Sequence, residues 1–301
     1  MRSTSLALSV VLLAGPALAR WRAPDEDAVR RSLGEAKKRP SLAERIVVVS
    51  DPFVGAPYRV SPLGEGDGPD PDPRLRFDAF DCTTFVETTL ALALAQDLEE
   101  ARALLDVIRY QQGTPDFLSR RHFPEAEWLP QLAELGFLED VTREVGQGEV
   151  VVEKKKLNAA VWERRRRPSH LELPEERIPD GVFSLDVWPL DLARRGQAQI
   201  PPGTLLNLVR VDFKSVPVRV SHQGIVIEKG GKRYLRHAAD RMYHSVVDEP
   251  LDRFFARMQK YKRWPVAGVH LMRMREPSGW RALLGQRITS EGEQQALSRA
   301  P

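Results

Sequence analysis

Three side chains in this sequence are of the types that cooperate in nucleophilic chemistry. Cys82 is the only cysteine of the chain, and His222 and His237 are two of its six histidines. The thiolate is the nucleophilic form of cysteine, and a nearby histidine can produce it by accepting the thiol proton. Such a histidine needs a third group that fixes its tautomer and orientation. The residue types therefore predict Cys82 as nucleophile, His222 as base and His237 as orienting residue.

A predicted helix would position the thiol. Apolar residues recur at three- and four-residue steps after Cys82, which predicts a buried helix over residues 82–95 with Asp81 as its N-cap. The thiol would then lie at the positive end of the helix dipole, which favours the thiolate. We therefore expect Cys82 to react rapidly with iodoacetamide below about pH 7.

A predicted hairpin would position the two histidines. His222 lies in a predicted strand over residues 218–228, and His237 ends a second strand after a glycine-containing turn at residues 229–232. The register of the two strands decides whether the histidines share a face, and the sequence does not fix it. His244 and Asp240 are therefore alternatives to His237 as the orienting residue.

The remaining segments predict the fold class. Glycine, proline and aspartate dominate residues 55–72, which predicts a long loop before the nucleophile. Further helices are predicted at residues 24–46, 98–110 and 158–166, and further strands at residues 204–211 and 266–274. Because the helices precede the strands, the sequence predicts an α+β domain with an antiparallel sheet.

The N-terminal residues have the three parts of a secretory signal. Arg2 supplies a positive charge, residues 6–13 form a short apolar run, and residues 17–19 form a small-residue cleavage site. A buried N-terminal helix is the alternative. The run is too short to span a bilayer and no comparable run follows, so we expect export to the periplasm or medium without an integral membrane span. The predicted parts are a signal peptide at residues 1–19, a main domain at residues 20–288 and a polar tail at residues 289–301.

Charge and composition narrow the possible partners and cofactors. The net charge of +3 does not indicate a nucleic-acid partner. Basic residues gather at 154–156 and 164–167, either as a solvated face or as a patch attracted to an anionic envelope polymer. No compact metal-ligand spacing occurs, so we expect no metal and no cofactor. A single thiol in an oxidising compartment is expected to be buried or used.

Several segments resemble one known family. Residues 77–88 (FDAFDCTTFVET) resemble the nucleophile motif of the N-acetylmuramoyl-L-alanine amidase-like family, within the NlpC-type, papain-like cell-wall hydrolases. In the wider superfamily valine often follows the base, where this chain has Gln223. The resemblance extends over residues 54–274. Its other matching segments are residues 62–66, 119–123, 221–225 and 235–238.

The resemblance implies a fold and a mechanism. The fold would be papain-like, with the nucleophile at the N-terminus of a buried helix packed on an antiparallel sheet. The acyl group of the substrate would be transferred to Cys82, and water would then release that group from the sulfur. His222 would act as base and then as acid, and His237 would orient His222. The oxyanion would be held by the Cys82 backbone N–H and the Tyr58 hydroxyl. The resemblance also suggests, as residues lining a substrate cleft, Ser119, Arg120 and His122, which could instead form a self-packed loop.

The substrate implied by the resemblance is peptidoglycan or its muropeptide fragments. The bond cut would join the lactyl group of N-acetylmuramic acid to L-alanine. Three alternatives stay open: an endopeptidase that cuts within the stem peptide, a non-catalytic wall-binding module, and a lipid acyltransferase on the same fold. Of these three alternatives, only the endopeptidase would use the Cys82 thiol to cleave peptidoglycan.

Overall fold

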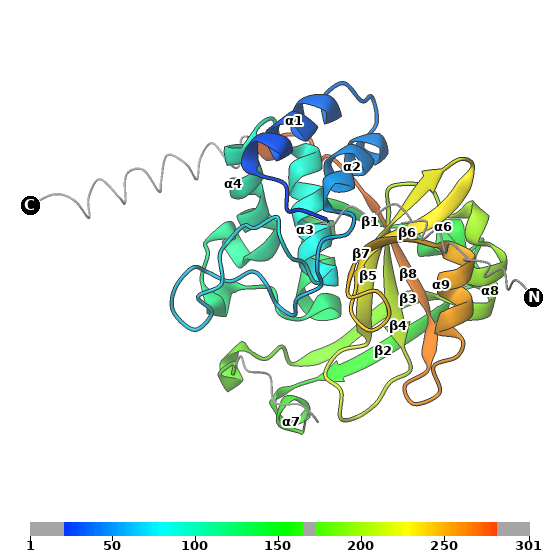
Figure 1. Cartoon of the computed structure of the whole chain (residues 1–301). Helices are drawn as coiled ribbons and strands as arrows, with labels where there is room; N and C mark the ends of the chain where they lie inside the picture. Colours follow the sequence, from blue (N-terminus) through cyan, green and yellow to red (C-terminus); the bar gives the residue numbers. More distant parts are fainter. Residues whose placement is uncertain (1–20, 165–171, 282–301) are drawn as a thin grey trace, which may run out of the picture.

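The computed structural model describes residues 21–164 and 172–281. The predicted signal peptide at residues 1–19 and the predicted tail at residues 289–301 lie outside these ranges. Within the described residues, helices and strands form three layers, with an antiparallel sheet between two groups of helices (Figure 1). The architecture is therefore α+β with an antiparallel sheet.

One helical layer is built around a central buried helix. Every residue of α3 from Thr84 to Leu94 is buried, because α3 packs against α2, α4 and strand β5. A helix that is apolar on all sides belongs inside a protein. The helices of this layer are α1 (Glu26–Ala36), α2 (Leu42–Ser50), α3 (Cys82–Leu94) and α4 (Leu98–Arg109).

The sheet has eight strands, and every pairing among them is antiparallel. The strand order is β2-β3-β8-β4-β5-β6-β7, and β1 also pairs with β8. The strands are β1 (Leu138–Asp140), β2 (Val151–Leu157), β3 (Gly181–Pro189), β4 (Thr204–Arg210), β5 (Val220–Lys229), β6 (Lys232–Ala239), β7 (Ser245–Pro250) and β8 (Val266–Met274).

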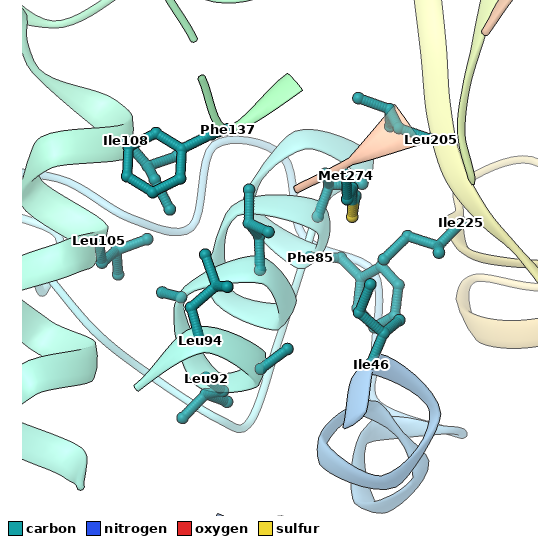
Figure 2. Close-up of a cluster of buried hydrophobic side chains, with 14 of the residues drawn as sticks. Ile46, Phe85, Leu92, Leu94, Leu105, Ile108, Phe137, Leu205, Ile225 and Met274 are labelled. Carbon is teal, nitrogen blue, oxygen red and sulfur yellow. The ribbon is translucent and has the colours of Figure 1, made fainter. Parts of the chain in front are cut away.

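Alternation along the strands divides the core between the two faces of the sheet. Ile225 packs with Phe85 of α3 and Ile46 of α2, whereas Val226 packs with Phe254 of α9. Figure 2 shows Phe85 between Ile225 and Ile46. Successive side chains of a strand point to opposite faces, so one strand contributes to both cores. The other helices are α5 (Leu129–Glu134), α6 (Thr142–Val145), α7 (Ala159–Glu163), α8 (Leu190–Arg195) and α9 (Leu251–Met258).

Most of the expected elements are confirmed. The helices predicted at residues 82–95 and 98–110 are α3 and α4, and the predicted hairpin is β5–β6 with its turn at Gly230 and Gly231. The basic residues 154–156 lie in β2, where Lys155 is buried and pairs with Asp212 at 2.7 Å. None of the described helices is long and apolar enough to cross a membrane.

Candidate active site

The first turn of α3 fixes the position of Cys82. Asp81 is the N-cap: its carboxylate accepts the backbone N–H of Thr84 at 2.8 Å, and its own N–H donates to the Thr84 hydroxyl at 3.0 Å. The same carboxylate accepts the N–H of Ser61 at 3.1 Å, which ties the preceding loop to the helix. Cys82 is therefore the first residue of the helix, where backbone N–H groups have no partner within the helix.

A chain of buried hydrogen bonds holds this turn against the sheet. The Thr83 hydroxyl donates to the side chain of Gln223 at 2.9 Å, and Gln223 donates to Asn207 of β4 at 2.8 Å. Gln223, to which the sequence assigned no role, thus joins the nucleophile turn to the two central strands.

The surroundings of Cys82 favour the neutral thiol. Burial raises the pKa of the thiol, and the charge of Asp81 raises it further, to about 12, against smaller opposing contributions from the Gln223 N–H and the Thr83 hydroxyl. Burial also lowers the pKa of His222 well below its usual value. Both groups are consequently neutral at neutral pH in the protein without substrate. The positive end of the helix dipole acts in the opposite direction, since it favours the thiolate.

The two histidines predicted from the hairpin are in direct contact. The Nε2 atom of His222 lies 2.6 Å from the Nδ1 atom of His237. Gly224 makes this approach possible, since a Cβ atom at that position would lie 2.9 Å from the Cβ atom of His237. His244, one alternative as orienting residue, has a side chain that is 74% exposed and lies near Asp240 instead. The structure therefore brings His237 to His222.

A carboxylate that the sequence did not indicate lies next to His237, on the side away from His222. The Nε2 atom of His237 lies 3.3 Å from a carboxylate oxygen of Glu249 in β7, and it is a buried atom without a hydrogen bond among the described residues. Glu249 is buried and pairs with Arg257 at 2.5 Å. Burial opposes ionisation, but the contacts with His237 and Arg257 lower the pKa of Glu249 to about 2. The strand pairing of Leu235 with Glu249 could have revealed it, but β7 has no clear sequence pattern.

The contacts with Glu249 and between the two rings determine which nitrogen of His237 and of His222 carries a proton. An ionised Glu249 favours a proton on Nε2 of His237, which leaves its Nδ1 atom to accept from Nε2–H of His222. The Nδ1 atom of His222 is then unprotonated and can accept the thiol proton. His222 immediately precedes Gln223, whose side chain binds Thr83 of the nucleophile turn, so the base and that turn belong to one segment of β5. No hydrogen bond joins the His222 ring to the sulfur among the described residues, as is common before substrate binds.

Tyr58 lies close enough to Cys82 for a charge on the sulfur to affect the pKa of the Tyr58 phenol. Its backbone pairs with Phe80, and its N–H donates to the His244 carbonyl at 2.9 Å. Burial raises the pKa of Tyr58 above its usual value, and negative charge on Cys82 and Asp81 raises it further. The phenol therefore stays protonated and can donate a hydrogen bond beside the sulfur.

The three residues predicted to line a cleft all have partners within their own region. Arg120 is buried and pairs with Glu65 at 2.6 Å and Asp70 at 2.9 Å, so its charge is already matched. The Ser119 hydroxyl donates to a carbonyl at 2.6 Å, and His122 Nε2 lies 2.7 Å from another. These contacts are those of the self-packed loop, and contact with a substrate stays a prediction.

No grouping of three or more histidine, cysteine or acidic side chains suited to a metal ion occurs in the part of the chain that the structure describes.

Comparisons with known proteins place the chain in a family and relate its fold to solved structures. Residues 48–261 match the AmiA-like, N-acetylmuramoyl-L-alanine amidase-like family model. A Legionella pneumophila protein of the family model DUF1460 is 23% identical, with a TM-score of 0.74 over 83% of this chain and 94% of that one. A Bacteroides uniformis N-acetylmuramoyl-L-alanine amidase is also 23% identical, with a TM-score of 0.62 over 78% of this chain and 99% of that one.

A putative xylanase from Bacteroides fragilis is 27% identical to this chain, with a TM-score of 0.58 over 75% of this chain and 99% of that one. No curated protein matches the sequence. Identities this low support a shared fold, whereas the family match covers most of the described residues.

Proposed function

The chain belongs to the AmiA-like, N-acetylmuramoyl-L-alanine amidase-like family, and from that premise we propose that it is a cysteine-dependent peptidoglycan amidase. Its fold would be papain-like, of the NlpC type, and the protein would act after export, in the periplasm or outside the cell. The observation that carries the proposal is the contact of His222 with His237, which leaves one imidazole nitrogen of His222 free to accept a proton. His222 is followed by Gln223, which binds the turn that carries Cys82.

In the proposed reaction, the thiol proton moves to Nδ1 of His222 as the Cys82 sulfur attacks the lactyl carbonyl carbon. Because both groups are neutral at rest, proton transfer accompanies attack instead of preceding it. The oxyanion is held by the Cys82 backbone N–H and the Tyr58 hydroxyl. His222 then gives the proton to the departing nitrogen of L-alanine, leaving a thioester between the lactyl carbonyl and Cys82.

Water completes the reaction. His222 takes a proton from a water molecule that attacks the thioester, and the Cys82 sulfur leaves and is protonated again. The products are a muramic acid with a free lactyl carboxylate and a peptide that begins with L-alanine. Throughout, His237 and Glu249 keep the imidazole of His222 in the required tautomer.

The test is a digest of purified muropeptides read by mass spectrometry. We expect the wild-type protein to release the sugar and an L-alanine-initiated peptide, and Cys82→Ala to release neither. His237→Ala should lose at least about 100-fold in rate, since acid–base catalysis contributes 10²–10⁴-fold. His244→Ala is the matched control and should keep full activity, because its side chain is exposed and away from His222.

The position of the cut distinguishes the proposal from its alternatives. Cleavage inside the stem peptide would keep the Cys82 mechanism and replace the amidase with an endopeptidase. Equal binding of muropeptides by wild type and Cys82→Ala, without cleavage by either, would replace the enzyme with a wall-binding module.

A further inference from the structure

Arg210 is a buried cation held entirely by neutral groups. It is the last residue of β4 and only 9% exposed. Its Nε atom donates to the Ser221 hydroxyl at 2.9 Å, and its Nη1 atom donates to the Trp264 carbonyl at 2.5 Å. The guanidinium also lies over the rings of Tyr261 and Trp264, 4.7 and 5.4 Å from their centroids. These contacts fix its orientation without neutralising its charge.

No carboxylate lies within ion-pair distance of Arg210 among the described residues. In the described part of the chain, four of the five other buried arginines differ in this respect, since each pairs with a carboxylate: Arg109, Arg120, Arg219 and Arg236. Two further cations, Arg241 and Arg257, are close enough to lower the pKa of Arg210. A buried charge without a counter-ion is costly, so a protein keeps one where something else supplies the opposite charge.

Arg210 lies at the candidate active site. Its partner Ser221 immediately precedes His222, and Arg210 is among the charges that lower the pKa of His222, after burial, His237 and Arg257. The Nη2 atom of Arg210 has no hydrogen-bond partner within the described residues, and it is not among their buried polar atoms. A donor with full positive charge is therefore open beside the base.

We propose that Arg210 binds a carboxylate of the substrate, and that the protein selects muropeptides whose stem carries a free carboxylate near the scissile bond. The inference rests on the proposed function, because it assigns a substrate group to that same site. Arginine suits this task, since its planar guanidinium forms short, charge-assisted hydrogen bonds with carboxylates. Stem peptides offer such groups, and amidation converts them to neutral carboxamides of nearly the same shape.

The test compares two muropeptides that differ only in one stem carboxylate or its carboxamide. Binding is measured by calorimetry in the Cys82→Ala background, so that the result does not depend on cleavage. We expect the carboxylate form to bind roughly 10- to 100-fold more tightly, as for a hydrogen bond to a charged group. Arg210→Met, which keeps the apolar stem and removes the charge, should abolish this preference and bind the carboxamide form as before.

Arg263→Gln is the matched control, because it removes an exposed arginine from the same segment as Trp264 and should keep the preference. Equal affinity of the two muropeptides for Cys82→Ala, or a preference that survives Arg210→Met, would overturn the inference. Cleavage by the wild-type protein is measured separately. If the wild-type protein did not cleave but the binding preference remained, the proposed function would be wrong and the carboxylate site would still stand.

Discussion

At the scale of single residues, environment decides the state of each catalytic group more than residue type does. Cys82 has the helix N-terminus that would favour a thiolate, but burial and Asp81 together raise its pKa to about 12. His237 is buried as well, which lowers its pKa, although Glu249 opposes the shift. The site therefore rests without charge on its nucleophile and bases, and charge develops only during reaction.

The first prediction concerns the reactivity of Cys82. Iodoacetamide should alkylate it more slowly at pH 7 than it alkylates a free cysteine peptide, because only the thiolate reacts. Asp81→Asn keeps the N-cap and removes the negative charge beside the sulfur, so alkylation should shift toward lower pH. Asp97→Asn, at the N-cap of α4, is the control and should change nothing. An alkylation rate that has already reached its plateau below pH 7 would instead show that Cys82 is a thiolate in the protein without substrate.

The second prediction concerns Glu249 as a positioning residue. Glu249→Gln should lower kcat by about tenfold or more, since the carboxylate stabilises the tautomers and the developing charge of the histidine pair. Removing the carboxylate also lowers the pKa of His237, so the acidic limb of the kcat/KM profile should move to lower pH. A pH profile separates this role from a merely structural one.

Asp248→Asn is the matched control for Glu249. Asp248 is the preceding residue of β7 and also pairs with an arginine, Arg236, but it raises the pKa of His237 less than Glu249 does. Asp248→Asn should reduce stability and move the acidic limb less than Glu249→Gln does. If both variants moved the limb equally, Glu249 would have no specific connection to His237.

At the scale of elements, close strand pairing holds the histidine pair together. Gly224 lies in β5 where the side chains of His237 and Leu235 leave no room for a Cβ atom, 2.9 Å from each. Gly224→Ala should therefore push β5 and β6 apart, cost about 1–3 kcal/mol of stability and reduce activity sharply. Thermal unfolding and the muropeptide digest measure the two effects.

Gly34→Ala is the corresponding control in a helix. A Cβ atom at Gly34 would meet nothing within 4 Å, and alanine in a helix interior is favoured by roughly 0.5–1 kcal/mol over glycine. This variant should be slightly more stable and fully active. Full activity of Gly224→Ala would show that the His222–His237 contact does not depend on this spacing.

The sequence predicted the elements that carry strong local patterns. The periodic apolar residues of α3 and the glycine turn between β5 and β6 were enough to place Cys82, His222 and His237 correctly along the chain. Strands β1, β2, β3 and β7 were not predicted; β2 is rich in lysine, and β7 is short and partly polar. Glu249 was missed for the same reason, since its importance depends on strand pairing between β6 and β7. The acylation mechanism and the scissile bond stay predictions from the family.

At the scale of the whole molecule, the layers meet through buried polar contacts as well as apolar packing. Arg236 is completely buried in β6, pairs with Asp248 of β7 at 2.7 Å and donates to the Ser50 hydroxyl of α2 at 2.8 Å. Cys82 belongs to the helical layer and the histidines belong to the sheet. The integrity of the site therefore depends on the same contacts that join these layers.

The last prediction concerns the stability of the whole chain in mild acid. Burial lowers the pKa of four histidines: His122, His222, His237 and His270. The unfolded chain binds protons at these positions below about pH 6.5, whereas the folded protein does not, so folding loses free energy as pH falls from there. His122, whose pKa is lowered to about 4, should alone account for about 2 kcal/mol between pH 7.5 and pH 5.

Urea unfolding at pH 7.5, 6.5 and 5 measures this loss. Stability should fall well before the paired carboxylates contribute, because Glu249, with its pKa near 2, loses its stabilising effect only as pH drops below about 4. His122→Gln can retain a hydrogen bond to the Phe117 carbonyl and should flatten the dependence, whereas exposed His244→Gln should not. A free energy of unfolding that stays constant from pH 7.5 to pH 5 would mean that these histidines are protonated equally in the folded and unfolded chains, and the neutral resting site argued above would not hold.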